Sequence, residues 1–370
     1  MQGDVIKIEE KDRQKMDDIG FNTDEAGRSG SFLMENDKVH HVSMKQEGVE
    51  MLSIKDALVK YPELNERMWK LVDKDKDEYT KDAYEDTQSG YFIRVKSGVK
   101  AFFPFQACFF LKKDKIKQKV HNLIILEDNA EIHIMNGCAA ASYLAEGSHI
   151  GITEMYVGKN SKLMYTMIHD WAKDVTVRPR SAIKVEEGGT YISNYIALRD
   201  TKITQMYPAA YLDGKGAVAK FNTLVMAPEG SVYDLGSRVF LNAPETRAEI
   251  TSRSVSKGGA VIARGHLKAN SPGVFAHLEC DGLMLTDGGV ISAIPELETK
   301  YADVNMSHEA AIGKVDEEQI LYLMSRGIPK NEAVSAIVSG FMDVKLLGLP
   351  PALEEEIKKH LKVLEESEGI

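Results

Sequence analysis

The stretch Glu186-Glu-Gly-Gly-Thr-Tyr-Ile192 joins a turn to a short β-prone segment, and Ser256-Lys-Gly-Gly-Ala-Val-Ile262 repeats this arrangement. Turns and strands that recur without helical patterns between them are typical of a β-solenoid or a β-sandwich. The paired glycines, followed by small and β-branched residues, favour the solenoid, because stacked coils need small residues at tight corners. Further turn signals, mostly about 26 to 31 residues apart, are Glu127-Asp-Asn-Ala130, Gly158-Lys-Asn-Ser161, Asp213-Gly-Lys-Gly216, Pro228-Glu-Gly-Ser231 and Asp287-Gly-Gly289.

Sequence texture divides the 370-residue chain into three parts. Residues 1–89 are polar and mixed in charge, and the spacing of apolar residues from Ile54 to Val72 predicts a helical and irregular region. Residues 90–313 hold the repeated turns and the short β-prone segments, and we expect them to form the core. Residues 314–370 return to helical periodicity. The prediction is a mainly β protein with one elongated solenoid core and helical regions at both ends.

Three short helices are predicted after the β core. Asp316 is placed to cap the first of them, which ends near Gly327. The second follows Pro329 and carries its apolar residues on one stripe, and the third is expected over residues 353–364. Such a module either covers the end of the solenoid or docks a partner protein.

The composition excludes several classes of protein. A formal net charge of −10 and a pI of about 5.6 argue against nucleic-acid binding, since neutralising phosphates requires a basic face. No apolar run reaches the roughly 18 residues that a transmembrane helix needs, and the amino terminus lacks the apolar centre of a signal peptide. We expect a cytoplasmic protein without membrane contact. Its three cysteines should be free thiols or ligands.

Cys280 is the first candidate for chemistry, because polar side chains surround it in the stretch from His277 to Asp281 and the pair His308-Glu309 follows about one repeat later. In stacked coils, residues one period apart lie on adjacent rungs about 4.8 Å apart. We therefore expect the thiol, the imidazole and the carboxylate to stack on one face as a soft-metal or sulfur-handling site. An imidazolium would favour the thiolate. The alternative is that Cys280 is a small buried hydrophobic residue.

Cys138 stands in a similar relation to His169 and Trp171, which follow roughly one period later. Small residues around Cys138 leave it either accessible or packed at a corner. Cys108 lies among phenylalanines without polar neighbours, and we expect it to be structural.

Several motifs are absent from the sequence. No cysteines or histidines have the spacing of a zinc finger, and neither the phosphate loop nor the dinucleotide-binding loop occurs. The sequence gives no support for a flavin site. Three cysteines cannot supply a conventional four-thiolate cluster within one chain. An iron–sulfur site would have to recruit histidine or carboxylate, or be shared between subunits.

Four motif regions resemble the SufB/SufD family, the scaffold components of the SUF machinery for iron–sulfur cluster assembly. They are Asn136-Gly-Cys138, Ile168-His-Asp-Trp171, Glu279-Cys280-Asp281, and Ser307-His-Glu-Ala310 with the following stretch to Ile328. The likeness covers about residues 90–344. It implies a right-handed parallel β-helix with a helical carboxyl-terminal domain, in agreement with the texture of the sequence.

The resemblance also implies roles for individual residues. Cys280 corresponds to the SufB cysteine implicated in cluster assembly at the subunit interface, and Glu309 to a glutamate beside the shared histidine, here His308. Cys138 corresponds to a cysteine proposed to accept sulfur, and His169 replaces the glutamine usual on the sulfur path. Because both Cys280 and Glu309 are retained, the chain resembles SufB more than SufD. The implied function is that of a non-enzymatic scaffold on which clusters are assembled and from which they are transferred.

The implied partners are a SufC-type ABC ATPase bound by the carboxyl-terminal helices, a sulfur donor protein, and a second family subunit. That subunit would form either a homodimer or a SufB–SufD-type heterodimer, with Cys280 of one chain facing His308 and Glu309 of the other. Two alternatives stay open at this point. One is a SufD-like structural partner without its own cluster. The other is a carbohydrate-active β-solenoid that uses the carboxylates Glu279, Asp281 and Asp287.

Overall fold

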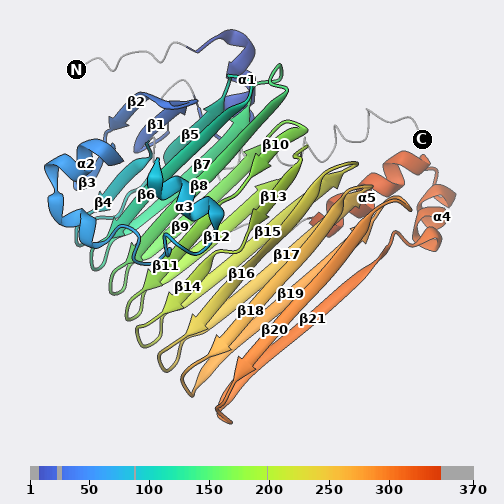
Figure 1. The fold of residues 1–370 in the computed structure, drawn as a ribbon. Helices are drawn as coiled ribbons and strands as arrows, with labels where there is room; N and C mark the ends of the chain where they lie inside the picture. The colour runs from blue at the N-terminus through green and yellow to red at the C-terminus, as the bar shows by residue number, and fades with distance from the viewer. Residues whose placement is uncertain (1–7, 23–26, 87–88, 198, 343–370) are drawn as a thin grey trace.

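The computed structural model describes residues 8–22, 27–86, 89–197 and 199–342 of the chain. They form a β-solenoid of about eight turns, in which two long sheets lie against each other and the chain passes between them at the corners (Figure 1). Neighbouring coils pair in parallel and in register, as in the long ladders of the carboxyl-terminal half. The prediction of a mainly β solenoid with helices at its ends is confirmed.

The first sheet, called sheet A, contains ten strands among the described residues. In spatial order they are β2 (Lys38–Met44), β1 (Gly30–Glu35), β5 (Phe105–Leu111), β7 (Glu131–Ala140), β9 (Lys162–Asp170), β12 (Thr190–Ala197), β15 (Val218–Pro228), β17 (Arg247–Lys257), β19 (Val274–Met284) and β21 (Val304–Lys314).

The second sheet, called sheet B, runs alongside sheet A and supplies the other half of each coil. Its strands are β3 (Val49–Ser53), β4 (Tyr91–Val95), β6 (Ile116–Leu126), β8 (Glu146–Val157), β10 (Asp174–Val177), β11 (Arg180–Val185), β13 (Ile203–Met206), β14 (Ala209–Leu212), β16 (Val232–Leu241), β18 (Ala260–Ala269) and β20 (Val290–Thr299).

One column of corners explains the repeat that is visible in the sequence. Its residues adopt positive φ angles of 53° to 69°, a region that glycine and asparagine tolerate best. The backbone N–H of Asn160, for example, donates to the carbonyl of Glu187 in the next coil at 2.9 Å. The column fixes the stacking of the coils, and its members are Asn129, Asn160, Gly188, Gly216, Glu245 and Gly273.

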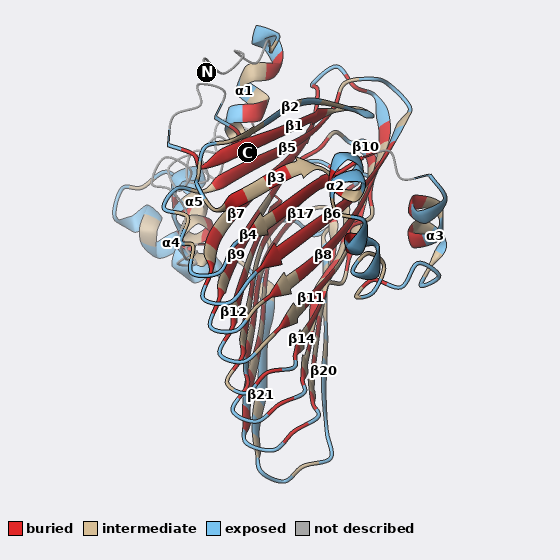
Figure 2. Cartoon of the chain, turned by 90° about the vertical axis from the view of Figure 1, so that its left-hand side faces the viewer, coloured by how far each residue is buried: buried red, intermediate tan, exposed pale blue. Residues whose placement is uncertain are grey.

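Side chains alternate between the interior of the solenoid and its outer faces, as the period of two in a β-strand requires. The inward-facing residues of both sheets form the main apolar core. The outer face of sheet A is also covered, because α1 (Glu10–Asp18) and α5 (Lys330–Met342) pack against it. Burial decreases toward the last coil, where β20 and β21 carry mostly exposed side chains (Figure 2).

The amino-terminal region contains helices, but it also contributes strands that the sequence analysis missed. Strands β1, β2 and β3 extend both sheets and cover the first coil. The buried run in β1 lacks the alternation of a half-exposed strand, because a neighbouring cluster covers its second face. The helical elements of this region are α2 (Ile54–Lys60), the 3-10 helix η1 (Pro62–Glu66) and α3 (Glu78–Glu85).

A buried carboxylate ties the loop after η1 to the solenoid. Glu154 on β8 accepts hydrogen bonds from four successive backbone N–H groups, of residues 69 to 72, at 2.5 to 3.2 Å. His121 on β6 lies 2.8 Å from the same carboxylate. Burial raises the pKa of Glu154, but the hydrogen bonds from His121 and the backbone outweigh it and leave the pKa lowered. The first half of the solenoid is therefore held on sheet B as well as on sheet A.

The carboxyl-terminal helices begin as predicted. The side chain of Asp316 accepts a hydrogen bond from the backbone of Glu318 at 2.9 Å and caps α4 (Glu317–Ser325). Gly327 follows that helix with a φ of 87°, and α5 begins after Pro329. The third helix expected over residues 353–364 lies outside the described residues. No helix in the described part of the chain is long and apolar enough to cross a membrane.

Candidate functional site

Cys280 lies near the end of β19 with its side chain in the solenoid interior, where it joins the main core and is only 3% exposed. Its partner in the last strand is Ala310, not His308. Burial, with a smaller contribution from the charge of Glu279, raises the pKa of the thiol to about 11. Cys280 is therefore protonated at neutral pH, and the expectation that a neighbouring imidazolium favours its thiolate is wrong for this arrangement.

His308 lies on the same inner face as Cys280. On β21 it pairs with Leu278, and Met306 on the same face packs against the core. His308 is thus one rung and two residues away from Cys280, which separates their Cα atoms by about 8 Å. His308 is exposed because β21 is the last strand of sheet A in the described chain. The thiol and the imidazole share the inner face of the sheet at the open end of the solenoid.

Glu309 lies on the opposite face of the sheet, which corrects the expected stack of thiol, imidazole and carboxylate. Its partner on β19 is Glu279, and neighbouring residues of a strand point to opposite faces. Glu309 therefore projects outward, where its carboxylate is 3.8 Å from the ring of His277. Within one chain, Glu309 does not share a face with Cys280 and His308.

The outer face behind Cys280 carries a compact charged group. Arg253 on β17 forms ion pairs with both Glu279 and Asp281, and its guanidinium lies 5.6 Å from the ring of Phe341 on α5. These contacts commit both carboxylates to a cation. They do not leave a free pair of acids of the kind that a glycoside hydrolase requires.

The second predicted pair, Cys138 and His169, is brought together directly. The two residues face each other on adjacent rungs of β7 and β9, inside the solenoid, with exposures of 1% and 4%. The side-chain amide of Asn136 donates to the sulfur of Cys138 at 3.2 Å. Burial raises the pKa of the Cys138 thiol far above its ordinary value. Cys138 is packed and protonated, which decides between the two environments that its small neighbours allowed.

His169 sits in a cluster of rings that the sequence analysis found only in part. Its Nδ1 lies 3.0 Å from the hydroxyl of Tyr195 on the next rung, and Trp171 is 5.4 Å away between ring centroids. His149 from sheet B completes the cluster against Trp171. Burial, together with a smaller effect of His149, holds the pKa of His169 well below its ordinary value. Tyr195 follows His169 by one repeat, so the periodicity could have revealed it.

A continuous inner row connects the two cysteine regions. Cys280 is preceded, rung by rung, by Ser252, Thr223 and Tyr195, and Tyr195 contacts His169 beside Cys138. The two strands that carry the cysteines, β7 and β19, are five rungs apart in sheet A, which corresponds to about 24 Å. The residues between them on this row are small or polar, unlike the aliphatic positions elsewhere in the core.

Cys108 behaves differently from the other two thiols. It points to the outer face of sheet A and joins the apolar cluster under α1, with no exposed surface. Burial raises the pKa of its thiol well above the ordinary value. This position agrees with the structural role expected for Cys108.

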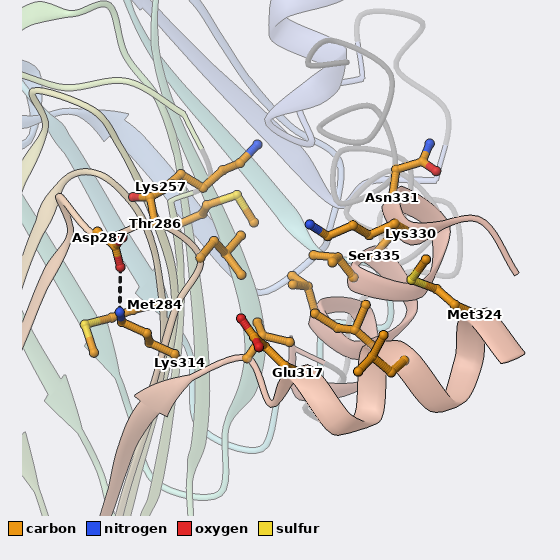
Figure 3. Close-up of a pocket in the computed structure, with 17 residues that line it drawn as sticks. Lys257, Met284, Thr286, Asp287, Lys314, Glu317, Met324, Lys330, Asn331 and Ser335 are labelled. Atoms are coloured by element: carbon orange, nitrogen blue, oxygen red, sulfur yellow. Dashed lines mark hydrogen bonds and ion pairs between the residues drawn. The ribbon is translucent and has the colours of Figure 1, made fainter. Parts of the chain in front are cut away.

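A cavity of about 790 Å³ separates the two carboxyl-terminal helices from the last coils (Figure 3). Its walls are largely apolar, with Met284 from the core and Met324 from α4 among them. Lysines stand around it, and one of them, Lys314, is paired with Asp287 at 2.5 Å. Leu321, Tyr322 and Met324 of α4 are 41% to 61% exposed, so this helix presents apolar surface to the outside.

Comparison with known proteins agrees with the geometry. The family described as SUF system FeS cluster assembly, SufBD core domain, matches residues 109–341. An iron-sulfur cluster assembly SufBD family protein of Archaeoglobus fulgidus is 50% identical over 354 residues, which make up 96% of this chain and 95% of the relative. A protein with the same family name from Methanothermobacter thermautotrophicus is 41% identical, covering 93% and 85% of the two chains.

A bacterial relative has a more specific name. The iron-sulfur cluster assembly protein SufB of Bacillus subtilis is 31% identical over 370 residues, covering 96% of this chain and 78% of the relative. The family match extends over more than half of the chain and includes both cysteine regions of the solenoid and both described carboxyl-terminal helices. The chain therefore belongs to the SufBD family of iron–sulfur cluster assembly proteins.

Proposed function

We propose that this chain is a SufB-type scaffold, on which iron–sulfur clusters are assembled at the open end of the solenoid and from which they are transferred. The observation that carries the proposal is the position of Cys280 and His308 on one inner face beside the uncovered last rung. Thiolate sulfur and imidazole nitrogen are ligands that iron in clusters accepts. The cluster is cargo in this proposal, and the chain itself is not an enzyme.

Sulfur enters at the other cysteine in this proposal. Cys138 accepts it from a sulfur donor protein, with His169 beside it, and the inner row through Tyr195 and Ser252 leads toward Cys280. Because Cys138 is 1% exposed, a donor protein cannot touch it in the conformation described here. Sulfur transfer therefore requires a more open conformation of this part of the solenoid.

An ATPase supplies the energy for that opening in our proposal. A SufC-type ABC ATPase docks on α4 and α5, where the exposed apolar residues of α4 offer a surface. The chain has no phosphate loop of its own, so nucleotide hydrolysis would take place on the partner.

A second family subunit completes the site. β20 and β21 are edge strands in the described chain, and edges of this length are templates for pairing with another chain. Such pairing would place Cys280 and His308 at a seam between subunits, where Glu309 of either chain contributes according to the geometry of the dimer. Both a homodimer and a SufB–SufD-type heterodimer satisfy this arrangement. A SufD-like role would preserve the ATPase contact without a cluster.

Anaerobic reconstitution with iron and sulfide tests the scaffold proposal. The wild-type chain, purified with its ATPase, should develop the visible absorption of an iron–sulfur cluster. Cys280→Ala and His308→Ala should each reduce this absorption strongly, whereas Cys108→Ala should retain it because Cys108 lies on the other side of sheet A. Unchanged absorption in both site variants would contradict the assignment.

A further inference from the structure

Three side chains on the outer face of sheet A are close enough to hold one metal ion. They are His277 and Glu279 on β19 and Glu309 on β21, and one potential ligand atom of each lies within 4.8 Å of the other two. The two strands pair in register, so Glu309 stands directly beside Glu279, with His277 two residues away on the same face. This group lies on the reverse side of the sheet from Cys280 and His308.

The histidine is oriented as a ligand would be. Nδ1 of His277 lies 2.9 Å from the hydroxyl of Ser307 on β21. When Nδ1–H donates to that hydroxyl, Nε2 keeps a free lone pair, and Nε2 is the atom that lies 3.8 Å from Glu309. Metal-binding histidines usually donate their other ring N–H to a neighbouring acceptor in this way. Ser307 therefore fixes both the ring and its tautomer.

The local charge also favours a cation. Glu279, Asp281 and Glu309 bring three negative charges to this part of the outer face, whereas Arg253 brings one positive charge in contact with the first two. The resulting net charge of these four groups is −2, which a divalent ion would neutralise. Arg253 meanwhile holds the carboxylate of Glu279 in place, so part of the site is ordered before an ion binds.

We propose that His277, Glu279 and Glu309 form a divalent-metal site that takes ferrous iron on the outside of the solenoid. One imidazole and two carboxylates are a donor set that suits Fe²⁺ and Mn²⁺. The site binds the ion before any sulfide is present, without Cys280. Its identification with iron for cluster assembly rests on the proposed function, but its existence as a metal site does not.

Anaerobic titration of the full chain with ferrous iron alone, without sulfide, tests the site. His277→Ala and Glu279→Gln should each weaken binding by more than the roughly 10- to 100-fold that loss of an outer-shell partner typically causes. Ser307→Ala should weaken it by about tenfold. Cys280→Ala and His308→Ala should leave this binding unchanged, because their side chains lie on the other face.

Two variants guard against misleading losses. Glu309→Gln changes a side chain that is 67% exposed and should lose iron without loss of stability. His266→Ala is a matched control, because His266 also lies on an outer face 3.5 Å from a single carboxylate, that of Glu298. Iron binding that survives His277→Ala and Glu309→Gln would overturn the proposal, and so would equal losses in His266→Ala. Retained iron binding in a chain that fails to assemble clusters would overturn only the scaffold role.

Discussion

The two cysteine regions of the solenoid use the same geometry in opposite settings. Cys138 lies where strands, α1 and the Glu154 anchor cover the coils, whereas Cys280 lies one rung from the uncovered end. Burial raises the pKa of both thiols, but for Cys280 only to about 11. The comparison teaches that position along the solenoid, rather than the immediate sequence neighbours, separates a closed thiol from one that a partner can reach.

The largest expected effect concerns the covered half. Glu154→Leu removes one partner of a buried pair and four backbone acceptor contacts, and it should destabilise the protein by about 3–5 kcal/mol. Denaturant unfolding measures this loss. Glu309→Gln at the open end serves as the control and should change stability by less than about 0.5 kcal/mol. Similar losses in the two variants would abolish the distinction between the ends.

The same carboxylate predicts a dependence on pH. Because the pKa of Glu154 is lowered in the folded state, its contribution to stability is present above the ordinary glutamate pKa and is lost as the pH falls through the folded value. Unfolding free energies of the wild type and Glu154→Leu should therefore converge in acid. Curves that stay parallel down to pH 3 or so would contradict this expectation.

A bulky residue on the inner row should separate the two ends functionally. Ser252→Leu fills space on the row before Cys280 and should cost about 1–3 kcal/mol through overpacking. Cluster assembly that depends on a persulfide donor should fail, whereas reconstitution with free sulfide should persist. Ser252→Ala keeps the space and should support both reactions. Donor-dependent assembly by the leucine variant would show that sulfur takes another route.

The difference between the thiols should also appear in alkylation. With a pKa of about 11, only about one in a thousand Cys280 thiols is ionised at pH 8, and this fraction rises about tenfold per pH unit. Mass spectrometry of the native protein should find modification of Cys280 accelerating in this way between pH 8 and pH 10 or so. Cys138 should stay unmodified over that range. Equal rates at both cysteines would remove the contrast.

The smallest effect on stability is expected on α4. Tyr322 is 58% exposed, so Tyr322→Ala should change the unfolding free energy by no more than about 0.5 kcal/mol. It should nevertheless weaken binding of the ATPase, which co-purification and calorimetry can quantify. Tyr143→Ala, at an equally exposed tyrosine far along the sequence, provides the control. Unchanged ATPase binding would move the docking surface away from α4.

Much of the fold follows from local signals in the sequence. Residues such as Asn160 and Gly188 occupy corners that require positive φ, and Asp316 caps its helix as any favourable first residue would. The pairing of Cys138 with His169 also follows from the repeat, because their 31-residue separation matches one coil there. These features depend on short-range chemistry, which the sequence carries directly.

The faces at the open end could not be predicted in the same way. Cys280 pairs with Ala310 across a coil of 30 residues, whereas the preceding coil pairs Ser252 with Cys280 across 28. Corner loops change length from coil to coil, and a shift of one residue moves a side chain to the other face. A spacing of 29 between Cys280 and Glu309 was therefore compatible with one shared face only if the coil had that length.

The corner column has a consequence for how such a chain can change. Each coil adds one rung, so the distance between the two thiols is available only in steps of about 4.8 Å. Removing a whole coil would shorten the route by one step and keep every remaining side chain on its own face, whereas removing a single residue would turn the following strand over. The length of the route can thus vary without loss of its lining, provided that variation comes in complete coils.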